Sequence, residues 1–190
     1  GVIDENTEFQ DLPKSIRCAG RVIREYDDKI DNNLTVEQIL IRSGNIGSVR
    51  IAQKVGIEKF KLFLENIGLL NKIKFDIEEV GQPISFRWGK CKLATASFGH
   101  GITTTPLQLA KAYSIISNGG FDIKPTLIKK KIKNKEDKKI ILNKGISKKI
   151  NLILRKIVST KEGTANFANI QGYDVGGKTG TAQKSKNGIY

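Results

Sequence analysis

Residues 172–184 read Gly-Tyr-Asp-Val-Gly-Gly-Lys-Thr-Gly-Thr-Ala-Gln-Lys, with the tripeptide Lys178-Thr179-Gly180 at their centre. Most of this stretch, residues 172–183, is typical of a glycine-rich strand. Alternate side chains of an extended strand point to the same face, so Thr179 and Thr181 would present two hydroxyls together. We therefore expect the strand to form one wall of a binding cleft.

A second short motif, Ser43-Gly44-Asn45, lies where two helices are predicted to meet. Thr35 and Gln38 have capping-box spacing, which predicts a helix that starts at Thr35. This helix should end near Ser43-Gly44, because glycine is the usual residue after a helix C-terminus. A second helix is predicted over 45–55, with Gly56 at its end. The motif thus marks a corner between two helices.

The rest of the chain is predicted to be mainly helical. A third helix is predicted to end at Gly68, and a last helix is predicted to begin at Ser147. Between them, a helix is predicted from Thr105-Pro106 to Gly119-Gly120, with Gln108 completing its capping box. Their expected apolar faces are Phe60, Phe63, Leu64 and Ile67; Leu109, Ala112, Tyr113 and Ile116; and Ile150, Ile153, Leu154, Ile157 and Val158.

Two further regions complete the expected organisation. Residues 69–88 read mostly as loop, and residues 125–133 and 138–142 read as a hairpin joined by a turn over 134–137. Helices dominate the middle of the chain and strands lie late in it. The predicted fold class is therefore α+β.

Charge is concentrated in one region of this 190-residue chain, whose formal net charge is +14. Residues 124–161 hold 14 Lys and Arg against two acids, which leaves only a small excess elsewhere. This segment has no aromatic residue on which bases could stack, so a solvated face is favoured over nucleic-acid binding. One histidine and two distant cysteines do not supply a metal site, and no cofactor is indicated. The sequence leaves open whether Cys18 and Cys91 pair.

The two short motifs together hold groups that a serine acyl-transfer enzyme needs around its nucleophile. Ser43 is a candidate proton relay between a lysine ammonium and a leaving nitrogen, and the Asn45 amide can both donate to and accept from a peptide-like substrate. Lys178 favours a carboxylate-bearing substrate through its charge.

The lysine motif supplies the remaining candidates. The hydroxyls of Thr179 and Thr181 can hold a substrate carboxylate, and Gly180 lets an acyl group lie close to the backbone. The Thr181 N–H can serve as one oxyanion donor, a role worth about 3 kcal/mol of barrier. The candidate catalytic residues are Ser43, Lys178 and Thr181, and the candidate substrate-binding residues are Asn45, Thr179, Gly180 and Thr181.

The surrounding sequence resembles the class B penicillin-binding proteins. The matching segments follow the order of that family: residues 94–110, 117–120, 124–126, 163–165 and 172–184. Within the family, the sequence is most similar to the cell-division type of peptidoglycan D,D-transpeptidase. The resemblance implies a penicillin-binding-protein/serine β-lactamase-like fold, in which a serine is acylated by a peptide stem ending in D-Ala-D-Ala and the acyl group passes to a neighbouring stem.

The resemblance also implies partners and a location. Expected ligands are peptidoglycan peptide stems and β-lactam antibiotics, which trap the acyl-enzyme. A glycosyltransferase and division proteins would be partners of the parent protein, and nucleic acid would not. The expected location is the periplasmic or extracytoplasmic side of the inner membrane, held by an N-terminal anchor that lies outside this chain.

One element of the family pattern is missing, because no serine of the chain has a lysine three positions later. In the family, this S-x-x-K nucleophile precedes the S-x-N element. The chain also has no Met, although a translated product begins with one. We therefore expect residues 1–190 to be a partial transpeptidase domain that begins after the S-x-x-K helix and ends just after the K-T-G strand. Such a fragment should be inactive alone.

Two alternatives remain open from the sequence. A β-lactamase or D,D-carboxypeptidase of the same superfamily would differ in how fast the acyl-enzyme is hydrolysed. A basic module that binds nucleic acid or an anionic surface through residues 124–161 is weaker, because the two motifs lie outside that segment.

Overall fold

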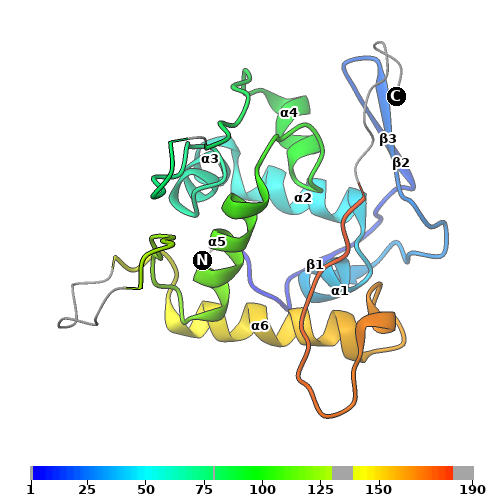
Figure 1. Ribbon diagram of the computed structural model, residues 1–190. Helices are drawn as coiled ribbons and strands as arrows, with labels where there is room; N and C mark the ends of the chain where they lie inside the picture. The colour runs from blue at the N-terminus through cyan, green and yellow to red at the C-terminus, as the bar shows by residue number, and fades with distance from the viewer. Residues whose placement is uncertain (1, 79, 130–138, 182–190) are drawn as a thin grey trace. The chain divides into compact units, whose positions relative to one another are not determined.

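The computed structural model describes residues 2–78, 80–129 and 139–181 (Figure 1). The chain divides into two compact units. The first comprises Gly1–Ile57, Arg87–Gly101 and Ile153–Tyr190, and the second comprises Glu58–Phe86 and Ile102–Leu152. In the described part of the chain, no helix combines the length and apolar character needed to cross a bilayer.

Two small antiparallel sheets open the first unit. Strand β1 (Glu8–Phe9) pairs with β4 (Leu34–Thr35), and β2 (Ser15–Cys18) pairs with β3 (Arg21–Arg24) as a hairpin. Ala19 and Gly20 connect the hairpin with positive φ angles of 48° and 77°. Such a two-residue turn matches the twist of the strands that flank it, but alanine is unusual there, so the turn was hard to predict.

Two helices of the first unit meet at the S-x-N corner, and a further short helix packs on the second of them. Helix α1 (Val36–Ile41) begins with the capping box of Thr35 and Gln38, and α2 (Asn45–Val55) ends at Gly56, which confirms both predictions. Gly47 lets the two helices approach, because a Cβ atom there would lie 2.6 Å from the Ile39 side chain. Helix α4 (Lys90–Ala96), which contacts α2, was not predicted.

Two groups of buried side chains hold the first unit together. The first joins the hairpin, the early loops, α1, α2 and α4, and consists of Leu12, Ile23, Ile30, Leu34, Ile39, Ile46, Val49 and Ala94. The second joins the end of α1 to the C-terminal part of α6 (Lys144–Ser159) and consists of Ile41, Ile153, Ile157, Val158 and Ala165. Burial of each leucine, isoleucine or valine in these groups contributes about 1.5–3 kcal/mol.

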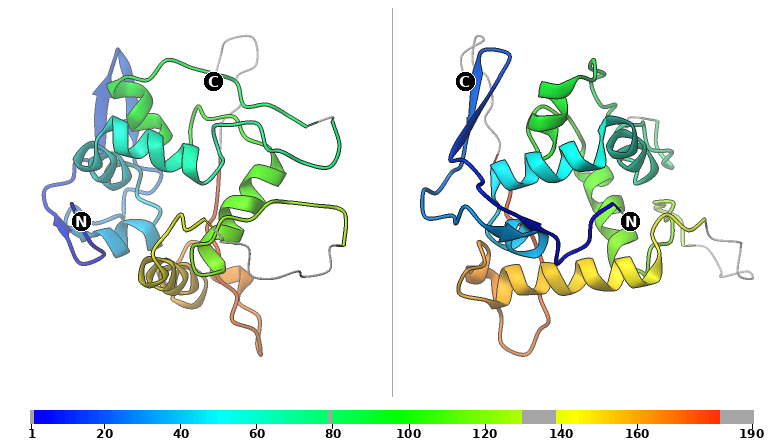
Figure 2. Two further views of the ribbon diagram at one scale, coloured as in Figure 1. Left: turned by 90° about the vertical axis from the view of Figure 1, so that its left-hand side faces the viewer. Right: turned by 180° about the vertical axis from the view of Figure 1, so that it is seen from behind.

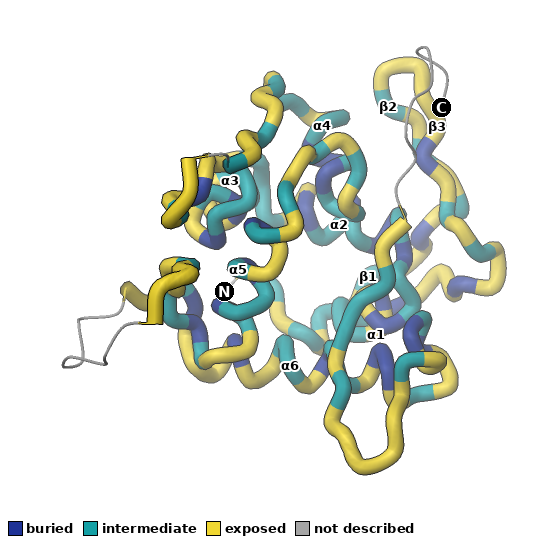
Figure 3. Tube along the Cα trace, in the orientation of Figure 1, coloured by how far each residue is buried: buried dark blue, intermediate teal, exposed yellow. Residues whose placement is uncertain are grey.

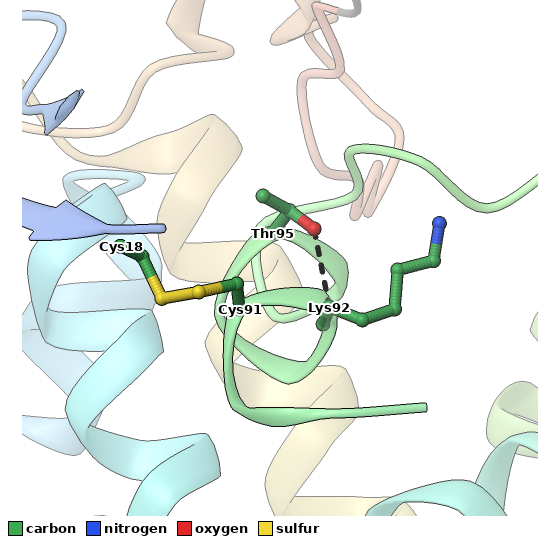
Figure 4. The surroundings of a disulfide bond; sticks show 4 residues. All are labelled: Cys18, Cys91, Lys92 and Thr95. Carbon is green, nitrogen blue, oxygen red and sulfur yellow. Dashed lines mark hydrogen bonds between the residues drawn. A yellow bond between two sulfur atoms is a disulfide. The ribbon is translucent and has the colours of Figure 1, made fainter. Parts of the chain in front are cut away.

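A disulfide between Cys18 and Cys91 joins β2 to α4 (Figure 4), with 73 residues between them in sequence and a Cα–Cα distance of 5.5 Å. It settles the pairing that the sequence left open. The bond links the hairpin directly to a helix that packs on α2.

The second unit contains most of α3 (Ile57–Asn66), α5 (Pro106–Ser117) and residues 144–152 of α6. The capping box of Thr105 and Gln108 is confirmed. The predicted inner face of α5 is partly wrong, because Leu109 is 45% exposed, whereas Gln108 and Ile115 are fully buried. The Gln108 amide donates to the carbonyls of Gly68 (3.2 Å) and Asn71 (2.8 Å). Because these loop carbonyls need a hydrogen-bond donor, Gln108 faces inward, and the buried face of α5 is shifted by about one residue from the predicted face.

The predicted hairpin after α5 does not form in the described residues. Residues 125–129 are not in a strand, and Ile140 instead makes an isolated antiparallel bridge with Phe121. The central part of the prediction, residues 130–138, lies outside the described residues. Helix α6 begins at Lys144 rather than Ser147, because the side chain and carbonyl of Asn143 accept from the Gly145 and Ser147 N–H groups.

The segment after α6 carries a short 3₁₀ helix, η1 (Asn166–Ala168), and then an exposed loop (Figure 3). The predicted K-T-G strand is absent from the described residues: 174–181 belong to no ladder and appear without an arrow in Figure 2. A strand requires a hydrogen-bonded neighbour, and here the Gly177 N–H instead donates to the Leu154 carbonyl of α6 at 3.1 Å. The predicted α+β class and penicillin-binding-protein-like fold are nevertheless confirmed.

Candidate functional site

The second buried group brings three distant parts of the sequence together. Ile41 and Ala165 belong to this group, and Val175 packs against it. Each of these three residues has a polar site residue within three positions: Ser43 after Ile41, Thr164 before Ala165, and Lys178 after Val175. Apolar burial thus places the polar groups beside one another.

Two polar contacts reinforce this placement. Lys156 of α6 forms an ion pair with Glu37 of α1 at 2.6 Å, and the Arg155 guanidinium donates to the Val175 carbonyl at 2.9 Å. The first ties α1 to α6, and the second ties the K-T-G segment to α6.

Ser43 has an unusual backbone conformation, with φ of 55°. Its N–H donates to the Leu40 carbonyl at 3.2 Å, and the Gly44 N–H donates to the Ile39 carbonyl at 2.9 Å. These bonds form a Schellman ending of α1 in which Ser43 holds the left-handed position that glycine usually takes. The sequence suggested Gly44 as the terminator, but Gly44 has φ of −61°. A serine kept in this strained position is typical of a functional site.

Four polar side chains meet at this corner. The Lys178 ammonium donates to Ser43 Oγ, and Ser43 Oγ lies 3.0 Å from Thr164 Oγ1 and 3.5 Å from Thr179 Oγ1. Thr164 Oγ1 and Thr179 Oγ1 are 2.9 Å apart. The structure therefore brings Ser43, Lys178 and Thr179 together, as expected from the sequence.

Burial governs the charge of the lysine at this site. Desolvation of the half-buried ammonium lowers the pKa of Lys178 from its ordinary value of 10.5. Among the residues that the structure describes, Lys178 contacts no carboxylate: its donors reach Ser43 Oγ, the Thr179 carbonyl (3.2 Å) and Thr179 Oγ1 (3.4 Å). A partly desolvated cation among hydroxyls favours an anionic ligand.

Thr164 is the site residue that the sequence reasoning missed. Gly163 before it lies against the end of α6, where a Cβ atom would be 2.0 Å from the Ile157 carbonyl oxygen. The Ala165 N–H donates to the same carbonyl at 3.2 Å. A Gly-Thr-Ala sequence directly after a helix was the available signal, because glycine there permits the close approach that directs the threonine into the site.

The first turn of α2 is fixed by an acidic residue of the hairpin. The Glu25 carboxylate accepts from the Asn45 N–H at 2.7 Å and the Ile46 N–H at 2.9 Å. The Asn45 side chain donates to the Arg24 carbonyl at 2.9 Å. Asn45 is thus two positions after Ser43 in the chain, and its amide is engaged by Arg24 rather than by the four-residue cluster.

Glu25 should therefore stabilise the corner. We expect Glu25→Ala to lower the free energy of unfolding by about 1–3 kcal/mol, because two helix N–H groups lose their acceptor. Glu25→Gln should cost less, since its amide oxygen can still accept. Urea unfolding measures both, and Glu8→Gln on an exposed strand position is the matched control. Equal stability of Glu25→Ala and the unsubstituted protein would contradict the assignment.

Two predicted residues lie at the end of the described chain. Gly180 and Thr181 are both exposed. Within the described ranges, the Thr181 side chain makes no hydrogen bond, so it is not part of the four-residue cluster. The role of its N–H as an oxyanion donor stays a prediction.

The arrangement can bind and orient an anionic, peptide-like group. One cation and three hydroxyls converge from two segments that are 120 residues or more apart in sequence. Hydroxyls can pass a proton between a lysine and a bound atom, and the cation can pair with a carboxylate.

The comparisons with known proteins agree on one family. The family described as penicillin binding protein transpeptidase domain matches residues 1–189. Stage V sporulation protein D of Bacillus subtilis is 36% identical over 169 residues, which cover 82% of this chain and 26% of that protein. The probable peptidoglycan D,D-transpeptidase FtsI of Caulobacter vibrioides is 30% identical over 154 residues, which cover 80% of this chain and 26% of that protein.

A solved structure supports the same assignment. The transpeptidase domain of penicillin-binding protein 3 from Burkholderia pseudomallei superposes with a TM-score of 0.89 at 26% identity, covering 99% of this chain and 57% of that one. The chain thus spans about a quarter of the two curated relatives and over half of this domain.

Proposed function

The chain belongs to the penicillin binding protein transpeptidase domain family, and we propose that it forms the S-x-N and K-T-G walls of a peptidoglycan D,D-transpeptidase. The observation that carries the proposal is the contact of Lys178 with Ser43, joined by Thr164 and Thr179. Residues 1–190 would correspond to the part of the domain that follows the S-x-x-K helix, and the nucleophilic serine would lie on that helix.

The proposed reaction has two transfers. The S-x-x-K serine attacks the carbonyl of the penultimate D-Ala, the peptide C–N bond breaks, and D-alanine leaves with a proton. An amine of a neighbouring stem then attacks the acyl-enzyme, which releases the serine and forms the crosslink. Ser43 relays the proton to the leaving nitrogen, and Asn45 aligns the peptide.

The carboxylate end of the substrate is assigned to the other wall. Lys178 and Thr179 bind the terminal carboxylate, with Thr181 as a further contact, and Gly180 keeps the backbone accessible. The Thr181 N–H is one oxyanion donor, a role worth about 3 kcal/mol. β-Lactams would occupy the same positions, because they imitate the terminal dipeptide.

The location and partners follow from the substrate. Peptidoglycan stems are crosslinked on the extracytoplasmic side of the membrane, and the disulfide between Cys18 and Cys91 suits an oxidising compartment. We extend the proposal to an N-terminal anchor, a glycosyltransferase and division proteins as properties of the complete enzyme. The β-lactamase and carboxypeptidase alternatives are not favoured, because the named relative is a transpeptidase.

Labelling with a fluorescent penicillin tests the proposal. We expect the complete enzyme, which joins this chain to an S-x-x-K serine, to form a covalent adduct that survives denaturation. The chain of residues 1–190 should remain unlabelled, since it has no S-x-x-K serine. Substitution of that serine by alanine in the complete enzyme is the control. Stoichiometric labelling of residues 1–190, or an unlabelled complete enzyme, would contradict the proposal.

A further inference from the structure

Thr164 bridges the two walls of the site. Its Oγ1 atom lies 3.0 Å from Ser43 Oγ and 2.9 Å from Thr179 Oγ1, whereas these two oxygens are 3.5 Å apart. Hydroxyl–hydroxyl hydrogen bonds are normally 2.5–3.0 Å long, roughly. The direct contact between Ser43 and Thr179 is therefore weak, and the path through Thr164 is the strong one.

The lysine gives this path a direction. An ammonium group has donors and no acceptor, so Lys178 can only donate to Ser43 Oγ. The Ser43 proton is then free for another acceptor, and Thr164 Oγ1 is nearer than Thr179 Oγ1. In the arrangement that we infer, Ser43 donates to Thr164 and Thr164 donates to Thr179, which lies 2.9 Å away.

The same direction leaves Thr179 with a free proton. In this arrangement its Oγ1 accepts from Thr164 and lies 3.4 Å from Lys178 Nζ, so both of its lone pairs face donors. Of the four groups, Thr179 then carries the one proton that is not used inside the cluster. A carboxylate offers only acceptors, so it is complementary to a hydroxyl held in this orientation.

Without the Thr164 hydroxyl, the hydrogen-bond direction from Lys178 to Thr179 should be lost. Ser43 would keep its contact with Lys178, but its nearest remaining hydroxyl neighbour would be 3.5 Å away. Thr179 could then turn its proton inward toward Ser43 as easily as outward.

We propose that Thr164 is a positioning residue that passes the hydrogen-bond direction set by Lys178 on to Thr179, so that the Thr179 hydroxyl donates to the substrate carboxylate. This inference rests on the proposed function. Thr164 itself touches no reacting atom, and its effect is confined to how well a carboxylate is distinguished from a neutral group.

The test uses two thioester analogues of acyl-D-Ala-D-Ala that differ in one group. One ends in a free carboxylate and the other in the corresponding primary amide. The second-order rate constant for acylation of the complete enzyme is measured with each, and their ratio is the carboxylate preference. Thr164→Val should lower this ratio about tenfold, and Thr164→Ser, which keeps the hydroxyl, should hold it within about twofold. Thermal unfolding of each variant checks that the domain is intact, and Thr164→Ala replaces Thr164→Val if valine prevents folding.

Each possible result either supports the inference or overturns it. An unchanged ratio with both rates lowered equally would assign Thr164 a purely structural role and overturn the inference. Loss of the preference in Thr164→Ser would also overturn it, because packing of the methyl group would then be the cause. If the unsubstituted enzyme is acylated by neither analogue, the proposed function itself fails and the inference fails with it.

Discussion

Replacement of Ser43 by glycine is expected to stabilise the protein relative to Ser43→Ala and to slow acylation strongly. Ser43 has φ of 55°, a conformation that costs an L-residue about 1–2 kcal/mol and glycine almost nothing. After allowance for the greater freedom of glycine in the unfolded chain, Ser43→Gly should be about 1 kcal/mol more stable than Ser43→Ala. Loss of the hydroxyl removes a proton relay, so both variants should be acylated about a hundredfold to ten-thousandfold more slowly.

The pair of variants separates the two effects. Both lack the hydroxyl that contacts Lys178 and Thr164, so they differ only in the backbone preference at this position. Urea unfolding gives the stability difference, and the rate of labelling by a fluorescent penicillin in the complete enzyme gives the catalytic loss. If Ser43→Ala proves the more stable variant, the backbone at Ser43 is not strained. If either variant is labelled within tenfold of the unsubstituted rate, Ser43 is not the relay.

The local structure was predictable where a short pattern decides it. The capping boxes at Thr35 and Thr105 and the glycine stop at Gly56 depend on neighbouring residues, and all three were found as expected. The faces of the helices were harder to predict. Gln108 is buried because carbonyls more than thirty residues away in the chain need its amide, and no pattern within α5 carries that information.

The prediction of a strand over the K-T-G motif was wrong for a related reason. Alternation of side chains describes an extended segment, but a sheet also needs a partner, and the Gly177 N–H is bonded to α6. The Cys18–Cys91 disulfide likewise depends on α4, a helix too short to leave a clear period in the sequence.

The grouping of Ser43, Lys178 and Thr179 could be predicted, because these residues belong to motifs whose chemistry is recognisable, whereas their roles stay predictions. Thr164 was not assigned a role, because its position depends on Gly163 packing against the Ile157 carbonyl. Glu25 was missed because it acts on α2 from the hairpin, twenty residues earlier in the chain.

Replacement of Lys178 by glutamine is expected to weaken acylation by carboxylate-bearing substrates and to change its pH dependence. Loss of a partly buried cation from a charge pair typically costs about 2–4 kcal/mol, which corresponds to roughly 30- to 700-fold in rate. Lys178→Arg should not restore the rate fully, because a planar guanidinium cannot donate to Ser43 as a compact ammonium does.

The pH dependence follows from the desolvated position of the lysine. Burial lowers the pKa of Lys178 below 10.5, so the charge is lost at a lower pH in the folded protein than in the unfolded chain. Acylation of the complete enzyme should therefore decline on the alkaline side before pH 10.5, and in Lys178→Gln this decline should disappear. Between the two pKa values the unfolded chain binds more protons, so the unsubstituted protein should gain stability relative to Lys178→Gln as the pH rises through that window. Rate profiles and urea unfolding across the alkaline range measure both effects. A profile in Lys178→Gln with the same alkaline limb would assign the titration to another group, and a relative stability that falls with pH would mean that Lys178 is better solvated than its contacts imply.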